Sequence, residues 1–162
     1  MDKYTELYDV LIIGGGPSGS NAAISYKKLN PSLKVGLIDK SIFPRDKSCG
    51  DAIGPGVISA LKRFNNEHIL DNEPQVVSTT LYGPDNIGIQ NYIPEVKNKA
   101  DSIVYVIPRI DLDNRILNLA KDLEVDVFEG YSFVSFEKDF DNKLVVEIKN
   151  EDNNIKFGTK IL

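Results

Sequence analysis

Residues 8 to 40 read YDVLIIGGGPSGSNAAISYKKLNPSLKVGLIDK. The apolar run from Val10 to Ile13 is too short for a helix and rich in β-branched residues, which predicts a buried parallel strand. The stretch from Pro17 to Leu29 reads as a helix, and the apolar run from Val35 to Ile38 predicts the next strand. A strand, a helix and a strand in this order predict an α/β fold built on a parallel sheet.

Three glycines separate the first strand from the helix in the spacing G-x-G-x-x-G: Gly14, Gly16 and Gly19. Gly14 permits a tight turn, Gly16 lets the backbone approach a pyrophosphate, and Gly19 lets the helix pack close to the sheet. The amides at the helix start then face the phosphate, whose negative charge the helix dipole favours. Because glycine-rich turns also occur for purely structural reasons, the interpretation depends on the flanking strand and helix.

The second strand ends on Asp39, twenty residues beyond Gly19. A carboxylate at this distance can accept hydrogen bonds from the ribose of an adenosine. Aspartate rather than arginine favours a ribose hydroxyl over a 2′-phosphate. The whole stretch therefore predicts a dinucleotide-binding βαβ unit.

The composition excludes several other classes of protein. A chain of 162 residues with 41% hydrophobic and 27% charged residues is typical of a globular domain. Its net charge of −5 argues against nucleic acid, and no apolar run approaches the ~20 residues that span a bilayer. One cysteine excludes a disulfide framework, and the first residues lack the apolar core of a signal peptide. We expect a cytoplasmic protein.

The segment after Asp39 contains the loop FPRDKSCGD, residues 43 to 51, followed by a helical pattern over 55 to 64. The guanidinium of Arg45 suits a pyrophosphate, although the residues alone leave a solvated surface loop equally open. The single histidine, His68, has no orienting partner nearby in the sequence, so we expect it on the surface.

The rest of the chain changes from extended segments to a helix and back to strands. We expect a second, antiparallel sheet from residues 76–81, 87–93 and 103–107, and a helix that Asp111 or Asp113 caps. A short strand at 124–128 and a three-stranded meander at 132–136, 144–148 and 155–157 follow, before a further apolar run from Thr159. The expected organisation is a nucleotide-binding part at 1–75, an inserted β segment at 76–108, and a continuation of the first part at 109–162.

Together these residues resemble the geranylgeranyl reductase family of FAD-dependent oxidoreductases, within the p-hydroxybenzoate-hydroxylase-like superfamily. The resemblance covers nearly the whole chain through DVLIIGGGPSG, Asp39, FPRDKSCGD and PRIDLDNRIL ahead of EVDVFEG. It implies a Rossmann-like FAD-binding sheet with an inserted antiparallel segment and a β-meander. The loop at 43–51 is more specific than the glycine motif, which many Rossmann proteins share.

The resemblance also implies the residues of a cofactor site. Arg45 and Arg109 would contact FAD, residues 49–51 would approach the flavin, and Phe133 would offer backbone to the adenine. The implied FAD-binding residues are Gly14, Gly16, Ser18, Gly19, Asp39, Lys40, Arg45, Cys49, Gly50, Asp51, Arg109 and Phe133. No catalytic residue and no metal ligand is implied, and NAD(P)H is compatible as the electron donor.

In this family the strand that begins at Thr159 leads into a further FAD-binding segment, and a substrate domain follows. We therefore expect this chain to be an N-terminal, truncated part of a longer flavoenzyme, a fragment that binds FAD weakly or not at all. The implied activity is reduction of isoprenoid carbon–carbon double bonds, with a small-molecule or isoprenoid-lipid substrate and peripheral contact with a membrane. The alternatives are an aromatic monooxygenase or halogenase, and a catalytically silent nucleotide-binding module.

Overall fold

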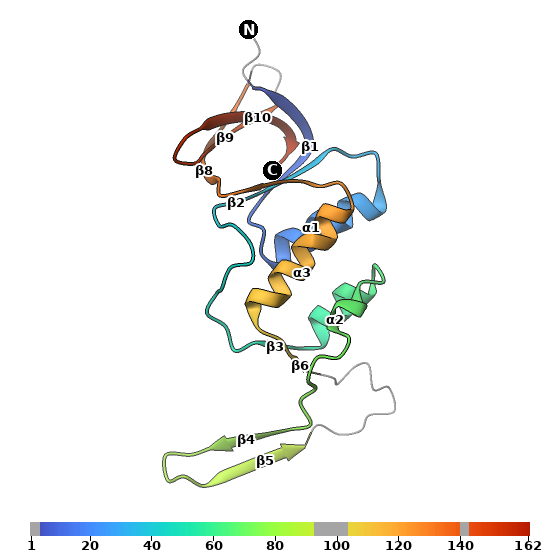
Figure 1. Ribbon diagram of the computed structural model, residues 1–162, viewed down its shortest axis with the longest axis vertical. Coiled ribbons are helices and arrows are strands. Elements are labelled where there is room, and N and C mark those ends of the chain that lie inside the picture. Colours follow the sequence, from blue (N-terminus) through green and yellow to red (C-terminus); the bar gives the residue numbers. More distant parts are fainter. Residues whose placement is uncertain (1–3, 93–103, 140–142) are drawn as a thin grey trace. The chain divides into compact units, whose positions relative to one another are not determined.

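The computed structural model describes residues 4–92, 104–139 and 143–162. The chain divides into two compact units. The first unit consists of Met1–Asp46 and Ile110–Leu162, and the second unit is Lys47–Arg109. Figure 1 shows the elements of both units, and each unit is described by itself below.

Within the described residues of the first unit, six strands form one sheet in the order β7-β2-β1-β10-β9-β8 (Figure 1). Strands β7, β2, β1 and β10 are parallel neighbours, whereas β10, β9 and β8 are antiparallel neighbours. The α/β fold with a parallel sheet and a meander is therefore confirmed. The strands are β1 (Glu6–Ile13), β2 (Val35–Asp39), β7 (Asp126–Glu129), β8 (Ser132–Lys138), β9 (Leu144–Lys149) and β10 (Asn154–Ile161).

Helix α1 (Pro17–Leu29) contacts β1 and β2, and its bounds are those that the sequence predicts. It buries Ser20, Ala23, Ile24 and Lys27, which recur at three- and four-residue spacing along one side of the helix. The buried Lys27 ammonium donates hydrogen bonds to the carbonyls of Pro31 and Leu33, 3.0 and 3.3 Å away. These bonds satisfy the charge and fix the chain between α1 and β2.

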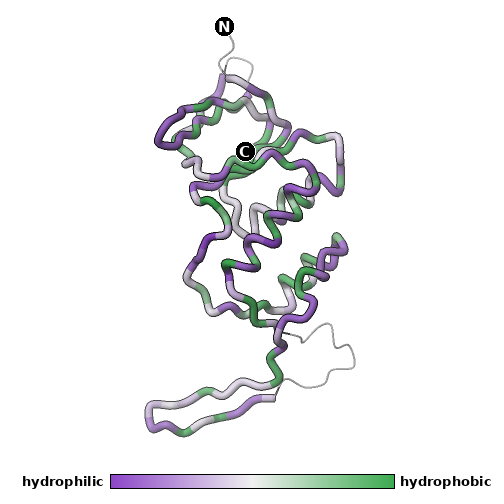
Figure 2. Tube along the Cα trace, in the orientation of Figure 1, coloured by the Kyte–Doolittle hydropathy of each residue, from purple (hydrophilic) through white to green (hydrophobic). Residues whose placement is uncertain are grey.

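The core of the first unit includes a cluster shared by strands that are not all neighbours in the sheet. Tyr8 of β1 and Ile38 of β2 belong to this buried cluster together with Ile148 of β9 and Phe157 of β10. The rings of Tyr8 and Phe157 meet edge to face, with their centroids 5.4 Å apart. The sheet therefore curls, so that the meander covers one side of the parallel strands. Figure 2 shows the hydrophobic residues gathered on these strands.

Several boundaries differ from the sequence expectation by a few residues, and two of these differences change how a segment is interpreted. The segments at 155–157 and from Thr159 form one strand, β10, because its pairing with β1 and with β9 continues through Gly158. Helix α3 (Arg109–Asp122) begins earlier than expected. Asp111 therefore lies in its first turn and Asp113 inside the helix, so neither residue is its N-cap.

Within its described residues, the second unit contains two separate two-stranded sheets instead of one three-stranded sheet. Strands β4 (Ser78–Tyr82) and β5 (Gly88–Tyr92) form the expected antiparallel hairpin. Strand β6 (Tyr105–Val106) pairs instead with β3 (Ala52–Ile53), where Ile53 of β3 and Ile107, just after β6, are buried. Burial of these side chains explains the pairing, and the expected strand residues 93 and 103 lie outside the described residues.

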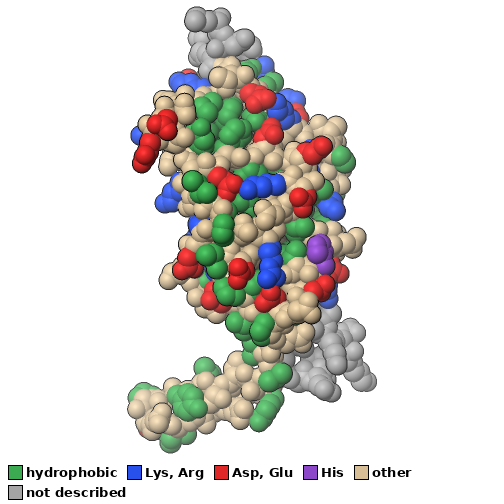
Figure 3. All heavy atoms as spheres, viewed as in Figure 1, with side chains coloured by type: hydrophobic (Ala, Val, Ile, Leu, Met, Phe, Trp, Pro, Cys, Tyr) green, Lys and Arg blue, Asp and Glu red, His purple; other side chains and the backbone are tan. Residues whose placement is uncertain are grey.

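The other elements in the described part of the second unit are helix α2 (Pro55–Lys62) and the short 3₁₀ helix η1 (Glu67–Leu70). His68 in η1 is exposed, as expected from the sequence. The β4–β5 hairpin is exposed along its length, and Figure 3 shows hydrophobic side chains on its visible face. Among the described helices of both units, none combines the length and apolar character needed to cross a bilayer.

Candidate functional site

The glycine turn between β1 and α1 is held tightly against the start of the helix. Gly14 adopts a φ of +106°, a conformation open mainly to glycine, and its N–H donates to the carbonyl of Ile38 at 2.7 Å. A Cβ placed on Gly19 would lie 1.8 Å from the carbonyl oxygen of Gly14. The predicted roles of these two glycines, a tight turn and a close helix approach, match this geometry.

The N-terminus of α1 is not capped by any side chain. Gly16 occupies the N-cap position in an extended conformation, Pro17 opens the helix, and the first turn holds no acidic residue. The hydroxyl of Ser20 donates to the carbonyl of Gly15 at 2.9 Å, which fixes the turn from inside the helix. The first-turn amides, that of Ser18 among them, therefore form an end of positive partial charge suited to an anion.

Asp39 connects the glycine turn to the segment that leaves β2. Its Oδ2 accepts the N–H of Gly15 at 2.7 Å, and its Oδ1 accepts the N–H of Ser41 at 2.8 Å. Each carboxylate oxygen has two lone pairs, so these bonds leave capacity for further donors such as ribose hydroxyls. The sequence predicts Asp39 as a site residue but does not reveal its two backbone partners.

Arg45 brings a positive charge to the same turn. Its Nη2 would lie 3.5 Å from a Cβ on Gly16, and its guanidinium carbon lies 4.8 Å from the centre of the Phe43 ring. Its Nη1 lies 3.1 Å from Oδ2 of Asp113, a residue of α3 whose side chain is fully buried. Asp113 was predicted only as a possible helix cap, and no spacing in the sequence links it to Arg45.

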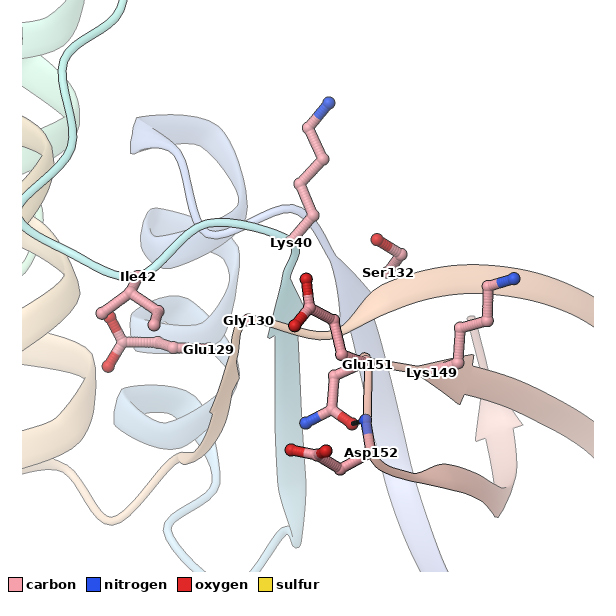
Figure 4. A pocket seen from close by; sticks show the side chains of 9 residues that line it. Lys40, Ile42, Glu129, Gly130, Ser132, Lys149, Glu151 and Asp152 are labelled. Carbon is pink, nitrogen blue, oxygen red and sulfur yellow. Dashed lines mark hydrogen bonds between the residues drawn. The ribbon is translucent and has the colours of Figure 1, made fainter.

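A pocket of about 660 Å³ opens at the carboxyl ends of β2 and β7 (Figure 4). Lys40 and Ser132 line it, and in Figure 4 the side chains of Lys40 and Lys149 point away from the other lining residues. The β9–β10 turn closes one side. The full lining is Lys40, Ile42, Glu129, Gly130, Ser132, Lys149, Asn150, Glu151 and Asp152. Both signs of charge are present, so this pocket differs from the positive α1 end.

Phe133 follows Ser132 on β8, which is the edge strand of the sheet. The pairing of β8 with β9 is regular at Phe133 but shifts between Phe133 and Ser135, which marks a bulge. A bulge leaves one residue out of the ladder and redirects the backbone groups beside it. The strand therefore offers backbone donors and acceptors close to the pocket, in keeping with the expected backbone role of Phe133.

Three predicted residues form a separate cluster in the second unit. The backbone N–H of Asp51 and then the guanidinium of Arg109 donate hydrogen bonds to the thiol of Cys49 and lower its pKa. The N–H of Arg109 also lies 3.3 Å from Oδ1 of Asp51. Cys49 is exposed, and Gly50 lies in the loop between these partners. The cluster can present an exposed thiolate beside a guanidinium.

The first unit thus brings together Gly14, Gly16, Ser18, Gly19, Asp39 and Arg45 around one helix end. Within the described residues, no group of three or more histidine, cysteine, aspartate or glutamate side chains has an arrangement that could hold a metal ion. The sequence does not indicate that Asp113 belongs to the site. The one feature that points to it is its position on the buried side of α3.

No family model matches the chain. Its fold is that of flavoproteins: an FAD-dependent myxobacterial chondrochloren halogenase superposes with a TM-score of 0.78, covering 97% of this chain and 37% of the halogenase at 21% identity. That likeness concerns the fold alone.

The curated relatives include several reductases and a flavin-dependent halogenase. The chain is 27% identical over 147 residues to a menaquinone reductase of Mycolicibacterium smegmatis, covering 91% of this chain and 35% of that protein. It is 26% identical over 160 residues to a digeranylgeranylglycerophospholipid reductase of Thermoplasma volcanium, covering 97% of this chain and 38% of that protein. The predicted resemblance to geranylgeranyl reductases is therefore confirmed. The chain spans about a third of the length of these relatives.

Proposed function

We propose that this chain forms the FAD-binding part of a flavin-dependent reductase. The proposal rests on one observation: the uncapped N-terminus of α1, the Arg45 guanidinium and the Asp39 carboxylate all lie around a single glycine turn. A positive helix end and a guanidinium suit a diphosphate, and a carboxylate at the end of β2 suits a ribose. These residues fit an adenine dinucleotide, and the flavin dependence named for a halogenase relative favours FAD among such ligands.

In this proposal the residues of the first unit hold different parts of the cofactor. The amides of Gly16 and Ser18 and the guanidinium of Arg45 bind the diphosphate, and Asp39 accepts from the adenosine ribose. Lys40 and the backbone of Phe133 contact the adenine beside the pocket. In the second unit, Cys49, Gly50, Asp51 and Arg109 belong to the flavin end. FAD, when bound, supplies hydride transfer, so the protein contributes binding, orientation and electrostatics.

The proposed substrate is an isoprenoid carbon–carbon double bond, carried by a small molecule or a lipid. The name of the Thermoplasma volcanium relative states that it reduces a digeranylgeranylglycerophospholipid. NAD(P)H is the proposed class of electron donor. A lipid substrate would require a cytoplasmic enzyme to touch the membrane surface from one side.

Halogenation or hydroxylation of an aromatic substrate is the second candidate, because the halogenase named above shares the fold. Product analysis separates the two activities in the longer protein of which the chain would form part. Turnover of an isoprenoid lipid without turnover of an aromatic substrate supports the reductase, and the reverse supports the alternative.

Binding can be tested on the 162-residue chain itself. We expect FAD and ADP to bind weakly and to shift the backbone amide NMR signals of Gly14 to Ser20 and of Ser41, with NADH giving a smaller response. Tight stoichiometric FAD would contradict the expected weakness and uphold the function. An absence of any shift with FAD and ADP at millimolar concentration would remove the proposed function, and an equal response to NADH would favour a plain NAD-binding domain.

A further inference from the structure

We propose that Asp113 is a positioning residue, which holds the guanidinium of Arg45 at the N-terminus of α1 before a diphosphate binds. This inference rests on the proposed function of the glycine turn. It adds a residue of α3, far from the turn in sequence, to the apparatus that binds the anion. Asp113 itself contacts no ligand in this proposal and acts through Arg45.

The geometry of the pair indicates a fixed contact. Oδ2 of Asp113 lies 3.1 Å from Nη1 of Arg45, and the two side chains are 0% and 16% exposed. The ring of Phe43 also contacts the guanidinium, with its centre 4.8 Å from the guanidinium carbon. An arginine that contacts both a buried carboxylate and an aromatic ring has lost most of its rotamer freedom before any ligand arrives.

The guanidinium also keeps hydrogen-bonding capacity. Nη1 is buried and, among the described residues, has no acceptor in hydrogen-bonding geometry, because its contact with Asp113 is close but poorly aligned. Nη2 faces Gly16, where a side chain would reduce the space beside the turn. A guanidinium presents five N–H donors in a planar fork that matches phosphate oxygens. Arg45 is therefore held in place while some of its N–H donors remain available to a ligand.

The charge of Asp113 opposes the binding of an anion, so Asp113 can favour binding only by positioning the guanidinium of Arg45. A carboxylate next to Arg45 cancels part of the positive field that a diphosphate meets. Removing that charge alone would strengthen the attraction of the site for phosphate. Releasing the guanidinium would have the opposite effect, because a long side chain must then be ordered when the ligand binds. If the charge of Asp113 dominates, removing it strengthens the binding of a diphosphate. If its positioning of Arg45 dominates, removing it weakens that binding.

The test compares ADP with adenosine on the 162-residue chain, using NMR titration. Asp113→Asn keeps the shape of the side chain and removes its charge. We expect it to weaken ADP binding about three- to tenfold, the factor that corresponds to ordering one long side chain on binding. Adenosine, which has no phosphate, should bind unchanged. In an Arg45→Met background the same Asp113 substitution should have no effect on ADP. Asp111→Asn, an exposed residue of the same helix turn, is the matched control.

Three results would overturn the positioning role: equal or tighter ADP binding by Asp113→Asn, an equal loss for adenosine, or a loss that persists in the Arg45→Met background. Thermal melts show whether each variant is folded. The Arg45 side-chain Nε–H signal gives a readout that needs no ligand, and it should be dispersed in the wild type and move toward the unstructured position in Asp113→Asn. If the wild type binds neither ADP nor FAD, the proposed function fails, and an Arg45 signal that is the same in both proteins means that Asp113 does not hold it.

Discussion

Strands β2 and β4 each have five residues, and they differ in almost every physical respect. Strand β2 pairs with β1 on one side and β7 on the other, and its residues Val35 to Ile38 are buried. Strand β4 pairs only with β5 within the described residues, and four of its five residues are exposed. Each strand carries a leucine, Leu37 at 0% exposure and Leu81 at 68%.

The difference shows where the molecule obtains the rigidity that a binding site needs. Strand β2 ends on Asp39, and the burial of its side chains fixes the position of that carboxylate against the glycine turn. An isolated two-stranded hairpin is marginally stable in water, because it buries little apolar surface. The β4–β5 hairpin keeps Val77, Leu81, Ile87 and Ile89 exposed, so its own contacts add little to stability.

The difference between β2 and β4 is tested most directly by replacing leucine with alanine in both strands. We expect Leu37→Ala to lower the free energy of unfolding by about 2–5 kcal/mol, because it leaves a cavity in a closed core. We expect Leu81→Ala to change it by less than about 0.5 kcal/mol. Urea unfolding followed by circular dichroism measures both. Similar losses for the two variants would mean that the hairpin contributes to the cooperative core.

Glycines sharpen the contrast between the two units. A Cβ on Gly19 would overlap the carbonyl oxygen of Gly14, whereas a Cβ on Gly54, before α2, has no atom within 4 Å. We expect Gly19→Ala to cost about 1–3 kcal/mol and to displace the helix end. Gly54→Ala should leave stability nearly unchanged. The same unfolding measurement compares them, and a harmless Gly19→Ala would show that the close approach of α1 is not required.

The second unit differs from the first in carrying an exposed cysteine thiol, that of Cys49. The Asp51 amide and the Arg109 guanidinium lower the pKa of Cys49, so its thiolate fraction at neutral pH exceeds that of an unstructured cysteine. Alkylation by iodoacetamide should therefore inflect at a lower pH than for a free cysteine peptide. Arg109→Gln should move the inflection upward, and Arg63→Gln, an exposed control, should not. An inflection at or above that of the free peptide would disprove the interaction.

The smallest expected effect concerns a surface ion pair between β10 and β1. Lys160 lies 2.6 Å from Asp9, whose pKa it lowers together with the backbone N–H of Lys34. A lowered pKa stabilises the fold above the unfolded value, and this contribution is lost as the pH falls through the folded value. Lys160→Met should cost about 0.2–1 kcal/mol at neutral pH and nothing in strong acid. A pH-independent loss would point to packing of the lysine stem instead.

Sequence patterns predict those parts of the fold that depend on residues close together in the chain. The bounds of α1 follow from the glycine turn, the proline at its start and its helical periodicity, all within one stretch. The pairing of β6 with β3 could not be predicted, because β3 has two residues and no periodicity. Its cause is the burial of Ile53 and Ile107, which depends on tertiary contacts.

The same limit on prediction from local sequence patterns applies to the candidate site. Asp39 could be placed by its distance from the glycines, since the βαβ unit fixes that spacing. Asp113 could not, because an aspartate near a helix start reads as a cap, and its contact with Arg45 joins segments far apart in sequence. The two backbone amides on Asp39 were equally invisible, because they depend on how the turn folds back.

Those two amides constrain how the chain could evolve a different ligand preference. Replacing Asp39 by arginine is the simple way to accept a 2′-phosphate. Here that exchange would also deprive Gly15 and Ser41 of their acceptor, at contacts of 2.7 and 2.8 Å. The turn that receives the diphosphate would loosen as the ribose preference changed. A single substitution at position 39 is therefore expected to abolish recognition instead of switching it, and a switch would require compensating changes in the turn itself.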